Sequence, residues 1–154
     1  MKEKIEHLKQ FDTPSITNVV ATYPNRDIFL GLYNPWETNW YTDQSLKCMY
    51  PELGSISGHV ITCVFGIADP NYNRLGIKDV LKAIPASERP VILAIKNNFP
   101  DDIKDKAALI GGNLMTAFKA VGCVGVLADG PSRDVDEIRE MGVQYMITGT
   151  TPGH

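Results

Sequence analysis

The stretch GGNLMTAFKAVGCVGVLADGPSRDVDEI, residues 111–138, predicts in chain order a helix, a buried strand, a turn and a second helix. Two glycines precede the first helix, and the strand is an unbroken run of small and apolar residues, typical of a strand covered on both faces. The turn after the strand contains Asp, Gly, Pro and Ser, which commonly end strands. The predicted elements are a helix over 113–121, a strand over 124–128, a turn over 129–132 and a helix over 135–141.

The same alternation of strand and helix continues on both sides of this stretch. Strands separated by helices of about ten residues are typical of βαβ units, so we expect an α/β fold with a parallel or mixed sheet and helices outside it. Residues 23–50 are irregular and rich in aromatic side chains, and we expect them to cross the core without a regular element. The other predicted elements are strands over 57–65, 91–95 and 145–148, helices over 1–11, 15–21 and 76–84 (the last ending at Pro85), and loops over 66–74 and 97–105.

Size, composition and charge restrict the class of protein. A chain of 154 residues, 44% of them hydrophobic and 21% charged, is expected to form one soluble domain over residues 1–154. The formal net charge of −3, without a block of Lys or Arg, argues against a nucleic-acid-binding module. No apolar stretch reaches the ~18–20 residues that span a bilayer, and the polar N-terminus has no signal-peptide core. We therefore expect a cytoplasmic protein with neither a membrane nor a nucleic-acid partner.

The three cysteines and three histidines do not indicate a metal site of their own. Cys48, Cys63 and Cys123 are far apart and odd in number, as expected for thiols in a reducing compartment. No pair of Cys or His residues has the spacing of zinc ligands, and the isolated histidines suggest no Ser-His-Asp arrangement.

Gly111 and Gly112, at the start of a predicted helix, are the first candidate for ligand binding. Two glycines leave the backbone N–H groups there uncovered, and the positive end of the helix dipole points the same way. Such a helix start binds carboxylate or phosphate well. The alternative is a purely structural turn in which glycine supplies a positive φ.

Arg133 and Asp134, which follow the predicted strand over 124–128, are the second candidate. In α/β proteins, ligands bind at the carboxyl ends of sheet strands. Arg binds carboxylates through two parallel hydrogen bonds, and Asp is a hard oxygen ligand for Mg²⁺ or Mn²⁺. The alternatives are structural, with Asp134 as the N-cap of the next helix and Arg133 as a surface charge.

Residues 111–138 also resemble the RraA-like family, whose hallmark is a Gly followed by Asp or Glu and, further on, an Arg-Asp pair. The family includes 4-hydroxy-4-methyl-2-oxoglutarate aldolases and regulators of ribonuclease E activity, and some members carry an older methyltransferase label that the fold does not support. Looser matches are DTPSITNVV at 12–20, with Asn18 near the family's Asp, and SGHVITC at 57–63. The resemblance therefore extends over nearly the whole chain.

The resemblance implies a fold, an assembly and a site. The family has a swivelling β/β/α fold, assembles as trimers or hexamers and places its active sites at subunit interfaces. Carried over to this sequence, Asp134 is the ligand of a divalent metal, Mg²⁺ or Mn²⁺, and Arg133 holds the pyruvyl group. The implied substrate-binding residues are Gly111, Gly112, Asn113, Leu114 and Arg133.

For function, the resemblance implies a metal-dependent lyase acting on pyruvyl-containing acids. The metal would stabilise the enolate formed by retro-aldol cleavage of 4-hydroxy-4-methyl-2-oxoglutarate or by decarboxylation of oxaloacetate. The alternative is a non-catalytic protein that binds a ribonuclease as its regulator. A fragment of a (β/α) barrel is a third hypothesis, because GVLADG at 125–130 and MITGT at 146–150 are similar to barrel strand ends, but the N-terminal half lacks regular βα repeats.

Two features depart from the family pattern. Counting back from Arg133 places Gly112 where the family has its acidic residue, and a shift by one places Asn113 there, so in either register that carboxylate is missing. The chain ends with GTTPGH, residues 149–154, in what reads as the middle of a loop, whereas family members continue with further strands. We expect a C-terminally shortened domain: a truncated product, a shortened gene or a divergent paralogue.

Overall fold

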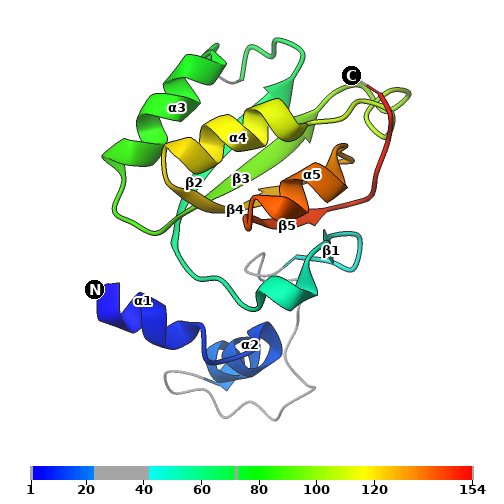
Figure 1. Cartoon of the computed structure of the whole chain (residues 1–154). Coiled ribbons are helices and arrows are strands. Elements are labelled where there is room, and N and C mark those ends of the chain that lie inside the picture. Colours follow the sequence, from blue (N-terminus) through cyan, green and yellow to red (C-terminus); the bar gives the residue numbers. More distant parts are fainter. Residues whose placement is uncertain (1, 23–41, 72, 154) are drawn as a thin grey trace.

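The computed structural model describes residues 2–22, 42–71 and 73–153 and confirms the α/β fold, in which three helices cover one face of a sheet (Figure 1). The described strands form one five-stranded sheet in the order β1-β5-β4-β3-β2. The pairs β2–β3, β3–β4 and β4–β5 are parallel, and β1 pairs antiparallel with β5. The strands are β1 (Lys47–Cys48), β2 (His59–Gly66), β3 (Val91–Asn98), β4 (Cys123–Ala128) and β5 (Gln144–Ile147).

The helices fall into two groups. The three that cover the sheet are α3 (Ile77–Ala86), α4 (Gly112–Ala120) and α5 (Val135–Glu140). The two N-terminal helices, α1 (Lys2–Leu8) and α2 (Thr13–Thr22), lie apart from these three, and a short 3-10 helix covers Pro51–Leu53 (Figure 1). Within the described ranges, every helix is too short or too polar to cross a membrane.

The core lies between the sheet and the three helices that cover it. β3 contributes Leu93 and Ile95 from alternate positions, so both side chains point to the same face of the sheet. α4 contributes Met115 and Phe118, which are three residues apart and therefore on one side of the helix. All four side chains are buried in one cluster, which continues into α5 through Ile138. This packing fixes α4 on the sheet and therefore fixes the point at which the helix begins.

The predicted elements are confirmed, with ends that differ by at most three residues, except in one stretch. Residues 23–41 of the stretch predicted to be irregular lie outside the described residues, but the prediction was wrong for β1. Two residues are too few to show an alternating pattern, and β1 is a strand because it pairs with Met146 and Ile147 of β5. α3 also extends one residue beyond Pro85, which lies in its last turn.

Three segments meet where β4 ends. The N–H of Leu109 donates to the carbonyl of Pro131 at 3.0 Å, which joins the loop before α4 to the turn after β4. The N–H of Ser132 donates to the carbonyl of Gly149 at 3.0 Å, and the N–H of Thr151 donates to the carbonyl of Ser132 at 2.9 Å. The turn after β4 is therefore held from both sides. It leads into α5, and its end lies beside the start of α4, because the N–H of Arg133 donates to the carbonyl of Ile110 at 3.3 Å.

Candidate functional site

Asp134 follows this turn, and its side chain binds the start of α4, whereas its carbonyl accepts from the N–H of Ile138 in its own helix. It occupies the N-cap position of α5 with a left-handed backbone, φ 59°, which Asp tolerates better than most residues. The structural alternative, Asp134 as the N-cap of α5, is therefore confirmed for the position, but its side chain makes no cap hydrogen bond there. Its Oδ2 instead accepts a hydrogen bond of 2.8 Å from the N–H of Gly112, the first residue of α4. The carboxylate thus lies at the positive end of the α4 dipole.

Arg133 lies beside this carboxylate, with its Nε 3.6 Å from Oδ2 of Asp134. Both side chains are partly exposed, 33% for Arg133 and 39% for Asp134, so a small molecule can reach them from solvent. They open on a cavity of about 150 Å³ beside the start of α4. Its lining residues are Ala108, Leu109, Gly111, Asn113, Leu114, Arg133 and Asp134. The structure therefore brings together the residues that the sequence singled out.

Gly111 and Gly112 are needed here for space and not for a positive φ. Gly111 has an extended backbone, with φ −124°, and neither glycine has a positive φ, so that alternative is wrong. A Cβ on Gly111 would lie 2.6 Å from Oδ2 of Asp134 and 3.0 Å from Nε of Arg133. A Cβ on Gly112 would lie 2.5 Å from both carboxylate oxygens of Glu137. A larger residue at either position would therefore displace charged side chains from the start of α4.

Glu137 is the residue that sequence reasoning missed. It lies in α5, three residues after Asp134, on the side of the helix that faces Gly112. That spacing of two acidic residues was the available signal. Only the packing of α5 against α4 shows that this side faces Gly112.

A buried pair of hydroxyl groups supports the turn that carries Arg133 and Asp134. Oγ of Ser132 donates to the carbonyl of Ile110 and is also hydrogen-bonded to the hydroxyl of Tyr145. Both side chains are fully buried, and burial raises the pKa of Tyr145, which keeps its hydroxyl neutral. The pair links β5 to the residue before Arg133 and holds the turn in position.

Ser132→Ala should lower the free energy of unfolding by about 0.5–1.5 kcal/mol, because it removes the short hydrogen bonds of Ser132 and leaves the Tyr145 hydroxyl with only a longer contact, of 3.4 Å, to the Ile110 carbonyl. Tyr145→Phe should cost less, since Ser132 keeps the Ile110 carbonyl as its acceptor. Urea denaturation followed by circular dichroism measures both values. A larger cost for Tyr145→Phe would contradict this arrangement of hydrogen bonds.

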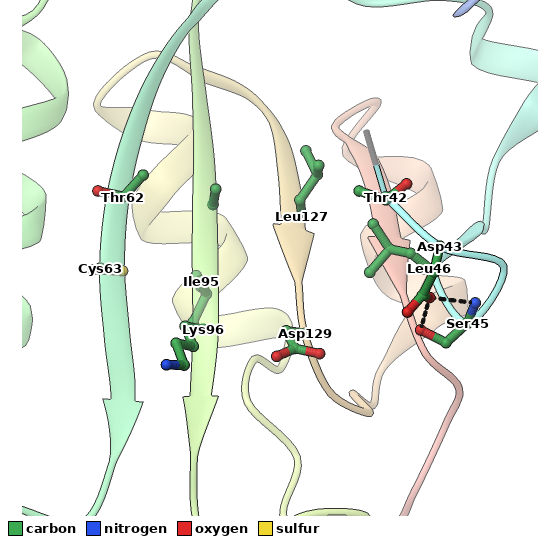
Figure 2. Close-up of a pocket in the computed structure, with 11 residues that line it drawn as sticks. Thr42, Asp43, Ser45, Leu46, Thr62, Cys63, Ile95, Lys96, Leu127 and Asp129 are labelled. Atoms are coloured by element: carbon green, nitrogen blue, oxygen red, sulfur yellow. Dashed lines mark hydrogen bonds between the residues drawn. The ribbon is translucent and has the colours of Figure 1, made fainter. Parts of the chain in front are cut away.

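A second and larger cavity, of about 440 Å³, lies on the sheet beside β2, β3, β4 and the segment over 42–46 (Figure 2). Its surface is mainly apolar, with Lys96 and Asp129 near the carboxyl ends of two neighbouring strands. Burial raises the pKa of the Cys63 thiol in its wall to about 11, so this thiol is not an ionised nucleophile near neutral pH. The smaller cavity is the stronger candidate, because a guanidinium, a carboxylate and a helix start converge on it.

Comparison with known families gives a match over most of the chain. The model of the RraA-like family, described as Aldolase/RraA, matches residues 34–154. This range includes every residue of the candidate site. No curated protein is similar enough in sequence to be matched.

Three solved structures resemble parts or all of the chain. The RNA-processing inhibitor RraA from Thermus thermophilis is 23% identical, with a TM-score of 0.49, and the match covers 71% of this chain and 59% of that one. RraAS2 from Streptomyces coelicolor, an unusual member of the RNase ES inhibitor RraA protein family, is 25% identical, with a TM-score of 0.46 and coverage of 62% and 43%. A structure described as novel cellulases from microbes associated with the gut ecosystem is 16% identical, with a TM-score of 0.68 and coverage of 99% and 60%, which is a likeness of fold alone. The chain therefore spans between 43% and 60% of the length of these three.

Proposed function

The chain belongs to the RraA-like family, which includes aldolases, and from this premise we propose that it is a divalent-metal-dependent carbon–carbon lyase. Its substrates would be pyruvyl-containing acids, through retro-aldol cleavage of 4-hydroxy-4-methyl-2-oxoglutarate or decarboxylation of oxaloacetate. The observation that carries the proposal is the convergence of the Arg133 guanidinium and the Asp134 carboxylate on the first N–H of α4. One small cavity thus has a cationic donor, an oxygen ligand and a helix dipole. From the same family membership we propose that the chain assembles as a homo-trimer or hexamer and that it acts in the cytoplasm.

The donor chemistry at Asp134 fits Mg²⁺ or Mn²⁺. Both ions prefer oxygen ligands, and Mg²⁺ keeps several waters while it uses one or two protein carboxylates. Asp134 is accessible to solvent and Glu137 is a second carboxylate nearby, whereas no cluster of three His, Cys, Asp or Glu side chains gathers in the described part of the chain. We assign Asp134 as the protein ligand. When bound, such a cation polarises the keto group of the substrate and stabilises the negative charge that develops on its oxygen.

Arg133 and the start of α4 would bind and orient the substrate. The guanidinium donates to carboxylate or keto oxygens through its planar fork and keeps its charge throughout the working pH range. The N–H groups in the first turn of α4 have no partner within the helix and suit a carboxylate. Asp134 already accepts from the N–H of Gly112, so a substrate carboxylate would use the N–H groups of Asn113 and Leu114.

Turnover by the purified chain tests the proposed function. With Mg²⁺ or Mn²⁺ present, the chain should form pyruvate from at least one of the two acids, measured by coupling to lactate dehydrogenase. EDTA should stop the reaction, and added Mn²⁺ should restore it. The control is the metal without protein, because metal ions alone promote decarboxylation of oxaloacetate. Pyruvate formation at the control rate with both substrates would overturn the lyase proposal.

The second candidate function is a non-catalytic protein that binds a ribonuclease. The observation in its favour is Gly112, which has no carboxylate side chain at a position where the resemblance leads us to expect one. Inhibition of a ribonuclease E-type enzyme by the chain, without any pyruvate formation, would favour this function over the lyase.

A further inference from the structure

We propose that Glu137 is a positioning residue of the same site, a role that rests on the proposed function. Its carboxylate lies in the space that a side chain on Gly112 would fill. There it acts with Asp134 to hold a divalent cation and the waters of that cation at the start of α4. α5 thus contributes a carboxylate that α4 itself lacks.

Two helices fix the position of Glu137. α5 is anchored in the core by the buried side chain of Ile138, and Glu137, although exposed to solvent, extends toward Gly112 at the start of α4. Its two carboxylate oxygens lie equally close to Gly112, each 2.5 Å from the place where a Cβ would stand. Asp134 binds the N–H of the same glycine. Both carboxylates therefore meet at one residue, Gly112.

The three charged side chains at this point leave a net negative charge. Asp134 and Glu137 contribute two negative charges and Arg133 one positive charge, so the three side chains sum to −1. The positive end of the α4 dipole stabilises both carboxylates in this position. A Mg²⁺ or Mn²⁺ ion bound by one protein carboxylate keeps most of its waters, and those waters need hydrogen-bond acceptors that orient them. Glu137 is such an acceptor beside Asp134.

Manganese binding to the full chain, followed by electron paramagnetic resonance of free Mn²⁺, tests this role independently of turnover. Glu137→Gln keeps the size of the side chain and removes its charge, and it should weaken Mn²⁺ binding about 10- to 100-fold, as expected for loss of a supporting partner of the ligand. Asp136→Asn is the matched control, because it removes the same charge from the same turn of α5, where that charge acts on Tyr50. It should change the affinity by about twofold at most, since an exposed charge is screened by salt.

Transfer of the carboxylate between the two helices separates a specific role from a general loss of charge. Glu137→Ala empties the space beside Gly112 and should weaken Mn²⁺ binding as Glu137→Gln does. Addition of Gly112→Asp to that variant returns a carboxylate to the same place from the other helix. The double variant should regain most of the lost affinity, which a merely structural effect of position 137 would not allow.

Two results would overturn the role of Glu137. One is equal Mn²⁺ affinity of Glu137→Gln and Asp136→Asn, and the other is failure of Gly112→Asp to rescue Glu137→Ala. In both cases, metal-dependent pyruvate formation by the unmodified chain would leave the proposed function intact. A chain that neither binds Mn²⁺ nor forms pyruvate would overturn both.

Discussion

Asp134→Ala should abolish metal-dependent pyruvate formation, leaving only the rate seen with the metal alone. Asp134 is the proposed metal ligand, and a Mg²⁺ site with one or two protein carboxylates loses the ion when it loses a carboxylate. The variant also places Ala at φ 59°, a conformation that costs most L-residues about 1–2 kcal/mol. Loosening of the turn would therefore add to the loss of activity.

Asp134→Asn separates the charge from the backbone. Asn tolerates the left-handed conformation and keeps an oxygen that can accept the N–H of Gly112, but it loses the negative charge. We expect it to unfold close to the temperature of the unmodified chain, measured by calorimetry, and to form no pyruvate in the coupled assay. Metal-dependent pyruvate formation by Asp134→Asn at an undiminished rate would mean that Asp134 has a structural role only.

The meeting of Asp134 with the start of α4 could be predicted because each belongs to a regular element. The apolar run over 124–128 predicts a strand, and in a parallel sheet the residues after a strand lie at its carboxyl edge. The glycine pair opens a helix that leads from one parallel strand to the next, and such a helix begins at that same edge. The hydrogen bond between Asp134 and Gly112 follows from this topology.

Features that depend on how two elements pack could not be predicted in this way. The hydroxyl of Tyr145 reaches Ser132 because β5 lies beside β4, and the sequence shows Tyr145 only as a residue of a strand. β1 is a strand because it pairs with β5, and its two residues show no pattern of their own. The sequence thus specifies elements and their order, while contacts between side chains of different elements require the packed structure.

The missing carboxylate near Gly112 shows the same limit. Counting from Arg133 left two registers open, with either Gly112 or Asn113 in the place of an acidic residue. In the structure Gly112 is buried at the site and bound to Asp134, whereas Asn113 is exposed. The space beside Gly112 contains the carboxylate of Glu137, which comes from a different helix. Counting along the sequence from Arg133 therefore does not find the carboxylate of Glu137, whereas the structure shows it beside Gly112.

Arg133→Lys should lower kcat/KM for the proposed substrates by about 10²-fold although it keeps the charge, by analogy with the loss of one preorganised donor to a transition state. The guanidinium is planar and donates to two oxygens at once, whereas the ammonium group of Lys acts as a point charge. Nε of Arg133 lies 3.6 Å from Oδ2 of Asp134, a contact that orients the plane of the guanidinium and that Lys cannot reproduce. The loss of activity therefore reflects geometry and not charge.

Steady-state kinetics of pyruvate formation measure this effect, with Arg139→Lys as the matched control. Arg139 lies on α5 but pairs with Glu52 at 2.6 Å, outside the cavity, so its replacement should leave kcat/KM unchanged. For Arg133→Lys the loss should appear in kcat as well as in KM, because the oxygens that Arg133 binds carry more negative charge in the transition state than in the bound substrate. A rise in KM alone would mean that Arg133 binds both states equally and only captures the substrate. An unchanged kcat/KM would overturn the role of Arg133 in the reaction. It would mean that the planar guanidinium does not orient the reacting group.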